Sequence, residues 1–206
     1  VNVDIITIID HNAADGIVRT ARETMSDIVI LGWPGKADLW DKLFGEKVEL
    51  VIRSMDKNLF VCHVEQNLIL NKRIVVISPP LAEREDGFGL WVDKVAKLSS
   101  ELSVPVLLLG HPDTHEVISR QRKTGNFTFQ TFVDWANPLS CGGMIKKDDL
   151  IILVSAHIGY ISHMSVLEGL PSRLEVNFPH HNRIVVYPKR HLADQLLESD
   201  DHIFIP

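Results

Sequence analysis

Two glycine-containing loops at matching positions of a repeat constrain the fold of this chain more than any other feature. The first is Gly32-Trp-Pro-Gly35, followed by nine residues and Gly45, and the second is Ala156-His-Ile-Gly159, followed by nine residues and Gly169. The two loops lie 124 residues apart, and each follows an apolar run that opens with an acid, Asp27–Leu31 or Asp149–Val154. Such self-similarity predicts that one strand–loop–helix unit is used twice.

Apolar runs of strand length alternate with amphipathic stretches along most of the chain. Strands are expected at Val1–Ile9, Asp27–Leu31, Leu59–His63, Arg73–Ile77, Val104–Leu109, Phe127–Val133, Asp149–Val154 and Arg183–Tyr187. Helices are expected at Ala13–Met25, Glu46–Ser54, Glu83–Ser103, Thr114–Lys123 and Pro171–Phe178, with Glu83, Glu85 and Asp86 in the first turn of the longest one. This alternation predicts an α/β fold in which helices cover both faces of a mostly parallel sheet.

Composition excludes several classes of protein. The net charge of −6 argues against a partner that is a nucleic acid, because such binding relies on clustered Lys and Arg. The two cysteines, Cys62 and Cys141, are far apart and form no CxxC motif, so neither a disulfide framework nor a cysteine metal site is expected. No apolar run approaches the roughly 18 to 20 residues that span a bilayer.

The glycines have two interpretations that the residues alone leave open. A loop after a parallel strand lies at the carboxyl end of the sheet, where α/β folds bind ligands. Gly32 and Gly35 would let the backbone approach a ligand, and Gly45 would open the next helix, whose free N–H groups favour phosphate. The same glycines could instead serve only as tight turns.

Gly-x2-Gly-x9-Gly resembles the nucleotide loop of universal stress protein domains, and Ala13–Gly32 looks like the helix and strand that precede that loop in the family. Longer segments are similar to the cytoplasmic C-terminal region of bacterial sodium:proton antiporters of the cation:proton antiporter family. These segments are Lys72–Glu83, Gly87–Val92, Val154–His157, Leu170–Ser172 and Val185–Pro188. The resemblance implies tandem universal stress protein-like units behind a membrane transporter.

The resemblance divides the chain into three parts. Residues 1–66 would form the C-terminal half of a first unit, residues 72–190 a second, complete unit, and residues 191–206 a C-terminal extension. The two units would pair through their last strands, Leu59–His63 against Arg183–Tyr187, as in a dimer. The incomplete first unit would leave a sheet edge exposed, which favours a homodimer or another partner.

Nucleotide-binding members of the family carry Ser or Thr after the last glycine, where the hydroxyl bonds a phosphate. This chain has Glu46 at that position of the first loop and Leu170 at that of the second. A carboxylate repels phosphate, and Leu donates no hydrogen bond. The first loop, with Gly32, Gly35, Gly45 and Glu46, is therefore the candidate site for ATP or AMP, in a degenerate form.

No set of residues predicts catalysis or a resident metal. His111 and His115 are four apart but separated by Pro112, and Ser140-Cys141-Gly142-Gly143 lacks a base placed by sequence. We therefore expect a non-catalytic regulatory or assembly domain at the cytoplasmic face of the inner membrane, attached to the transmembrane antiporter domain of the same polypeptide. The alternative is a soluble tandem universal stress protein that binds ATP or AMP.

Overall fold

The computed structural model describes residues 5–32, 40–121, 126–168 and 170–189, with the backbone alone for residues 40–46. Its strands are β1 (Ile28–Gly32), β2 (Asn58–His63), β3 (Arg73–Ile77), β4 (Val106–Gly110), β5 (Phe127–Thr131), β6 (Asp149–Val154) and β7 (Arg183–Tyr187). Its α-helices are α1 (Ala13–Glu23), α2 (Trp40–Ser54), α3 (Phe88–Leu102), α4 (Pro112–Gln121), α5 (Ser165–Glu168) and α6 (Leu170–Asn177). Short 3-10 helices are η1 (Leu68–Leu70), η2 (Ala82–Arg84) and η3 (Pro138–Met144).

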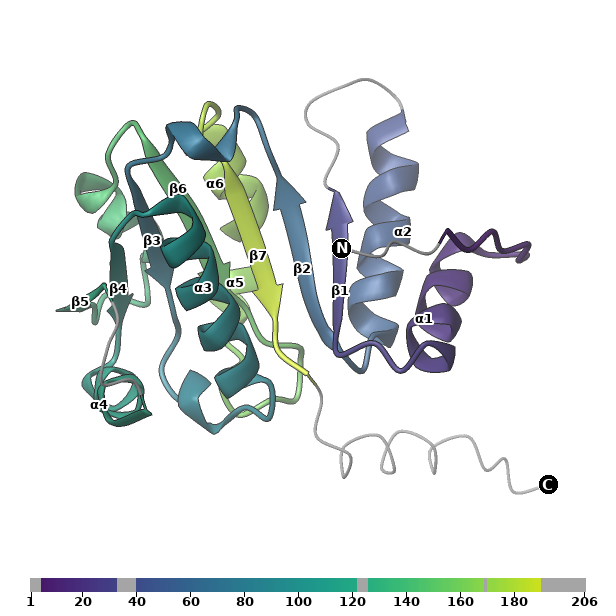
Figure 1. Cartoon of the computed structure of the whole chain (residues 1–206), viewed down its shortest axis with the longest axis horizontal. Coiled ribbons are helices and arrows are strands. Elements are labelled where there is room, and N and C mark those ends of the chain that lie inside the picture. Colours follow the sequence, from purple (N-terminus) through teal and green to yellow (C-terminus); the bar gives the residue numbers. More distant parts are fainter. Residues whose placement is uncertain (1–4, 33–39, 122–125, 169, 190–206) are drawn as a thin grey trace.

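The described strands form one sheet of seven in the order β1-β2-β7-β6-β3-β4-β5 (Figure 1). Every neighbouring pair is parallel except β2 and β7, which run antiparallel. The order places β3 at the switch point of its half of the sheet, because the chain passes from β3 outward to β4 and β5 before it returns to β6. Open α/β sheets bind ligands beyond the carboxyl ends of such strands.

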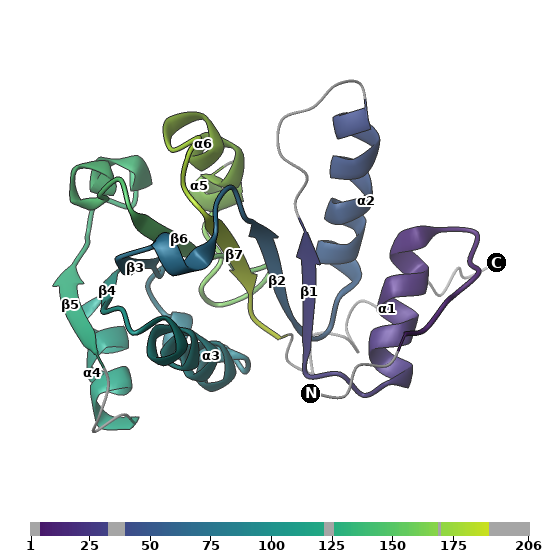
Figure 2. The ribbon, with the colours of Figure 1, turned by 45° about the horizontal axis from the view of Figure 1, so that its top comes forward.

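Helices cover both faces of the sheet, as the sequence predicts (Figure 2). Ile74 and Val76 of β3 pack with α3 and α4 in one core cluster. Val75 and Ile77 belong to the cluster on the other face, which also holds α1, α2, α5, α6 and η3. This alternation along one strand follows from the two-residue period of a β-strand. The fold class is therefore α/β, with a mostly parallel sheet between two layers of helices.

The predicted pairing of Leu59–His63 with Arg183–Tyr187 is confirmed as the antiparallel pair of β2 and β7. Val61 lies opposite Val185 at the centre of this pair. These two residues are 124 positions apart, the same interval that separates the glycine loops. The four strands β1-β2-β7-β6, counted from one edge of the sheet, are therefore arranged symmetrically about the boundary between β2 and β7.

Two asparagines make matching contacts across this boundary. The side-chain oxygen of Asn58 accepts a hydrogen bond from the Lys189 backbone N–H at 3.3 Å. The side-chain oxygen of Asn182 accepts one from the Glu65 backbone N–H at 2.8 Å. Asn58 and Asn182 are 124 residues apart, and so are Glu65 and Lys189. Each half of the molecule thus bonds the chain that leaves the last strand of the other half.

The predicted first strand is wrong over the part that the structure describes. Residues 5–10 are irregular, and the side chains of Ile5 and Ile9 are 92% and 95% exposed. The residues are β-branched and suit a strand, but no described strand lies beside them. A strand without a neighbour leaves its backbone unpaired and its side chains in water, so composition alone does not form it.

The long helix predicted at Glu83–Ser103 begins later than expected. Residues 82–84 form η2, and α3 begins at Phe88. Glu85 does not complement the helix dipole; it is buried and accepts hydrogen bonds from the backbone N–H and the hydroxyl of Ser162, at 2.9 and 2.6 Å. A tertiary contact has therefore replaced the helical turn that the acids suggested.

Other boundaries differ by less. The weakly specified segment Trp135–Ile145 is largely the 3-10 helix η3. The C-terminal extension at residues 191–206 lies outside the described residues. Within the part of the chain that is described, no helix combines the length and the apolarity that crossing a bilayer requires.

Candidate functional site

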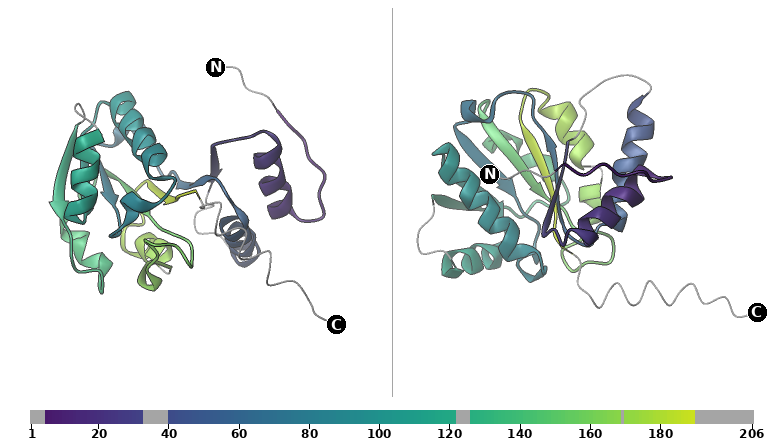
Figure 3. Two further views of the ribbon diagram at one scale, coloured as in Figure 1. Left: turned by 90° about the horizontal axis from the view of Figure 1, so that it is seen from below. Right: turned by 45° about the vertical axis from the view of Figure 1, so that its right-hand side comes forward.

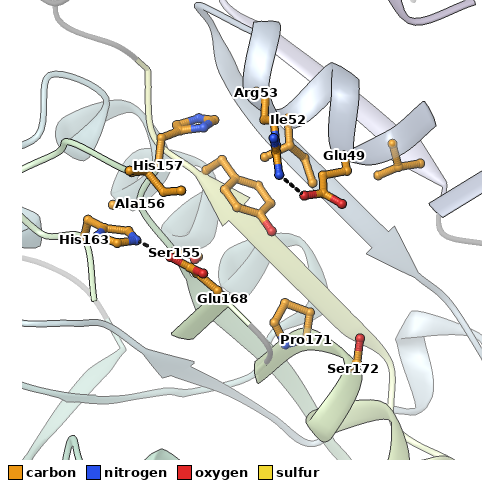
Figure 4. A pocket seen from close by; sticks show the side chains of 13 residues that line it. Glu49, Ile52, Arg53, Ser155, Ala156, His157, His163, Glu168, Pro171 and Ser172 are labelled. Carbon is orange, nitrogen blue, oxygen red and sulfur yellow. Dashed lines mark hydrogen bonds and ion pairs between the residues drawn. The ribbon is translucent and has the colours of Figure 1, made fainter. Parts of the chain in front are cut away.

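A cavity of about 420 Å³ lies between the two halves, where the chain leaves β6 (Figure 4). Ser155, Ala156 and His157 of the second loop form one side, and α2 of the first half forms another. The volume lies within the range of small-molecule sites, roughly 300 to 1,000 Å³. The remaining lining residues are Val48, Glu49, Ile52, Arg53, Ile158, His163, Glu168, Pro171, Ser172 and Tyr187.

The α2 side of the cavity carries an ion pair. Glu49 and Arg53 are four residues apart on the helix, so they lie on one face, and their side chains meet at 2.5 Å. Val48, one residue before Glu49, is buried and fixes this face of α2 against the core. Burial of the helix on one side therefore aims a carboxylate and a guanidinium at the cavity from the other.

The opposite side carries a second pair of polar side chains. His163 lies 2.9 Å from Glu168, the last residue of α5. Pro171 and Ser172 follow in the first turn of α6. Figure 4 shows the two pairs facing each other across the cavity. Two carboxylates and one guanidinium thus border the space.

Tyr187 at the end of β7 contributes an aromatic ring between these sides. Burial, and to a smaller extent the nearby carboxylate of Glu49, together raise its pKa to about 12. The phenol is therefore protonated at neutral pH. Its ring lies 5.5 Å from the ring of His157, which lies 5.2 Å from that of Tyr160. The three rings form a continuous aromatic group beneath the second loop.

The structure describes the predicted first-loop residues only in part. Gly32 ends β1 and is exposed, with no atom within 4 Å of the place a Cβ would take. Gly35 lies outside the described residues. Gly45 does not open a helix, because α2 already begins at Trp40, and Gly45 and Glu46 lie inside it. The expectation that Gly45 presents free N–H groups to a phosphate is therefore wrong.

The second loop lines the cavity, but the residue expected to contact a phosphate, Leu170, is buried. Gly159 has a φ of +89°, which its lack of a Cβ permits. Gly169 lies outside the described residues. Leu170 is 0% exposed and packs in the core below α6. The residue at the position where nucleotide-binding domains carry a phosphate-bonding hydroxyl is therefore buried in this half.

Sequence reasoning missed the cavity residues on α2. Glu49 and Arg53 have the spacing of a helical ion pair, and that spacing was visible in the sequence. Their relevance depends on the pairing of β2 with β7, which brings α2 to the second loop. Tyr187 was visible only as the last residue of a strand. The site is therefore a product of the interface between the halves.

The other candidate groups do not form a reactive centre. Burial raises the pKa of the Cys62 and Cys141 thiols to about 11, so both remain protonated at neutral pH. His111 immediately precedes α4 and His115 lies on it, and burial together with His111 lowers the pKa of His115. Among the described residues, no group of three or more His, Cys, Asp or Glu side chains is placed to hold a metal ion.

Comparisons with known proteins bear on the fold. No family model matches the sequence. The curated proteins contain no match either. Among solved structures, a universal stress protein from Archaeoglobus fulgidus DSM 4304 aligns with 87% of this chain at 11% identity and a TM-score of 0.49. The alignment covers 66% of that protein's chain, just under two thirds of its length. At this identity and score the likeness is one of chain course alone.

Proposed function

We propose that this chain is a non-catalytic regulatory and assembly domain of a membrane sodium:proton antiporter, built of universal stress protein-like units. It would lie at the cytoplasmic face of the inner membrane, in the same polypeptide as the transmembrane domain. The supporting observation is where the antiporter-like segments lie. Val154–His157, Leu170–Ser172 and Val185–Pro188 all contribute residues to the cavity.

A fourth antiporter-like segment lies at the contact between the halves. A Cβ on Gly87 would collide with the side-chain oxygen of Asn58 and lie 2.5 Å from the backbone nitrogen of Lys189. Four of the five segments that carry the resemblance thus contribute to the cavity or to the junction beside it, and the fifth, Lys72–Glu83, contains β3. We take this gathering of antiporter-like segments where the two halves meet as support for a role in movement or assembly.

The cavity offers a physical route for regulation. One side belongs to α2 of the first half, and the others belong to the second loop, α6 and β7. A ligand that contacts both halves would stabilise the arrangement in which they are this close, and would shift the population toward it. In an antiporter, that shift would reach the transmembrane domain as a coupling between two sites.

The charges of the cavity favour a ligand without phosphates. Glu49 and Glu168 border it, each already paired, and the buried Leu170 offers nothing to a phosphate oxygen. ATP in the second loop would place several negative charges beside the carboxylates of Glu49 and Glu168, with the guanidinium of Arg53 as their counter-charge in the lining. We therefore infer that the regulatory ligand is a neutral or zwitterionic small molecule.

Transport measurements test the regulatory role. The coding sequence upstream of Val1 should encode transmembrane helices. Antiport assayed in inverted membrane vesicles should persist when this domain is removed, with a changed dependence on pH or sodium concentration. Double substitution Glu49→Ala and Arg53→Ala should change that dependence in the same direction as removal. An upstream sequence without such helices, or an unchanged dependence, would contradict the proposal.

The alternative is a soluble tandem universal stress protein that binds ATP or AMP at the first loop. The exposed Gly32, with open space around its Cα, supports it, because a ligand can approach the backbone there. Mass spectrometry of purified protein would detect a retained adenine nucleotide. Millimolar ATP with Mg²⁺ or AMP should then raise the melting temperature, and Gly32→Val should remove that rise. No retained nucleotide and no rise would exclude this alternative.

A further inference from the structure

Strand β1 forms an edge of the sheet, and one of its faces lacks a cover. Val29 and Leu31 pack against the core that holds α1 and α2. Ile30 points to the other face and is 69% exposed. The helices of that face, α3 and α4, lie over the other half of the sheet, and Figure 3 shows α1 and α2 standing apart from them. An open edge beside an exposed isoleucine is a place where polypeptide can add.

The second half shows what occupies the matching place. Asn58 and Asn182 correspond, and the strand registers then match Ile28 with Leu150 and Ile30 with Ile152. Ile152 is 1% exposed. Strand β3 pairs with β6 at this point, with Val76 beside Ile152, and α3 packs on the same face. A strand and a helix therefore cover in the second half what is open in the first.

The acids that open β1 and β6 show the same contrast. Asp149 is buried and holds Arg73, the first residue of β3, with guanidinium nitrogens 3.0 and 2.6 Å from its two oxygens. Asp27 occupies the matching position before β1, and its side chain is exposed. The missing neighbour of β1 would therefore begin with a basic residue.

The exposed run at the start of the chain fits the same scheme. The strand registers match β1 with β6 at an interval of 122 residues. At the 124-residue interval of the glycine loops, Val3–Asp10 matches Phe127–Asp134, with Thr7 on Thr131 and Asp10 on Asp134. Phe127–Thr131 is β5, which two strands, β3 and β4, separate from β6. The run at 5–9 would accordingly lie two strands away from β1. Its exposure follows, since those two strands are not among the described residues.

We propose that the open edge of β1 and the face of Ile30 bind a strand–helix–strand–helix segment from the same polypeptide, outside residues 1–206. Its first strand would run parallel to β1 and open with Arg or Lys beside Asp27. Its first helix would cover Ile30, and its second strand would receive the run at 5–9. A second copy of this chain fits less well, because edge-to-edge pairing of β1 strands would leave Ile30 uncovered. The inference rests on the repeat and holds whether or not the protein is an antiporter.

Hydrogen exchange on two proteins tests it: residues 1–206, and the same chain extended along its own coding sequence by about 75 preceding residues. In the extended protein the amides of β1 should exchange at least tenfold more slowly. Ile30→Lys should remove that protection, and Asp27→Asn should reduce it. Val176→Lys is the matched control, because it likewise places a lysine at an exposed β-branched residue of a regular element. It should leave the protection of the β1 amides unchanged.

Three outcomes would overturn the proposal. One is equal exchange of β1 in the short and the extended protein. Another is an effect of Ile30→Lys no larger than that of Val176→Lys. The third is a dimer of residues 1–206 in sedimentation that Ile30→Lys dissociates, because the face would then belong to a second copy. Antiport is not measured in these experiments, so their failure is separate from failure of the regulatory proposal.

Discussion

Asn182 holds three segments of the chain together just before β7. Its side chain accepts hydrogen bonds from the backbone N–H groups of Glu65 and Gln66, at 2.8 and 3.0 Å. It donates to the Gln66 carbonyl and to the side-chain oxygen of Asn71, at 2.9 and 2.8 Å. Because Asn182 is 0% exposed, water does not replace these bonds when they are lost.

Asn182→Ala should lower the free energy of unfolding by about 3 kcal/mol, since it leaves several partly buried groups without partners. Urea denaturation measures this value. Asn177→Ala is the control, because Asn177 is exposed and its side chain bonds only the Arg173 carbonyl within its own helix. Its effect should stay within about 0.5 kcal/mol. A loss below 1 kcal/mol for Asn182→Ala would contradict the role given to this residue.

Tyr187 makes the free energy of unfolding of the protein depend on pH in the alkaline range. Its pKa rises to about 12 in the folded protein, mainly through burial, from a value near 10 in unfolded chains. A raised pKa stabilises the fold below pH 10, and that contribution is lost as the pH climbs from 10 to 12. The loss should be on the order of 2 kcal/mol.

Denaturation of the wild type and of Tyr187→Phe between pH 9 and 12 measures this contribution. The free energy of unfolding of the wild type should fall relative to that of Tyr187→Phe as the pH rises through this window. Absorbance at 295 nm should report one phenol that ionises near pH 12, which the Phe variant lacks. A pH-independent difference would show that the ring alone, and not the buried hydroxyl, matters here.

Among the elements, α3 shows how a contact between halves controls a helix. Gly87 caps its N-terminus, and Gly89 lies within its first turn. A Cβ on Gly87 would meet Asn58 and the backbone of Lys189, whereas a Cβ on Gly89 would meet nothing within 4 Å. Substituting Gly89 therefore measures helix propensity alone, whereas substituting Gly87 also measures the effect of the close contacts.

Gly87→Ala should destabilise the protein by about 2 kcal/mol, the range of overpacking against a backbone that cannot move away. Gly89→Ala should stabilise it by about 0.5 to 1 kcal/mol, because alanine is the better helix former. Thermal unfolding of both variants provides the test. If Gly87→Ala is as stable as the wild type, the Asn58 contact is not as close in solution as in the structure.

The elements also show what can be predicted from the sequence. Seven of the eight predicted strands were placed within two residues of their observed ends. In all of them except β5, the side chains alternate between, or fill, two apolar layers, so burial follows composition. The run at 5–9 has the same composition and was wrongly predicted as a strand, because a strand needs a neighbour that composition does not report. The start of α3 was missed because Glu85 bonds Ser162, a contact 77 residues away in sequence.

The site shows the same limit. The pairing of β2 with β7 was predicted, but its consequence for α2 was not, so Glu49 and Arg53 were overlooked. Gly45 was placed at the end of a loop, with the helix beginning at Glu46, yet α2 begins at Trp40 and includes both residues. Local patterns predicted the elements, and the cavity depended on which elements the topology brings together.

At the scale of the whole molecule, the two halves differ in how they are buried. The half from β3 to β7 has a core on each face of its sheet. The half with α1, β1, α2 and β2 has helices on one face, and its attachment to the sheet is the β2–β7 ladder. Fewer buried apolar contacts per residue mean a lower free energy of local opening.

Native-state hydrogen exchange should therefore find that β1 opens at a free energy at least about 2 kcal/mol below that of β3. Val61→Ala, at the centre of the ladder, should lower the protection of β1 more than that of β3, because Val61 lies on the strand beside β1, whereas β7 and β6 separate it from β3. The matched substitution Val154→Ala, in the core beneath α3, should lower both. Equal opening energies of β1 and β3 in the wild type would mean that the halves unfold as one unit. A ligand in the cavity could then not regulate by shifting one half relative to the other.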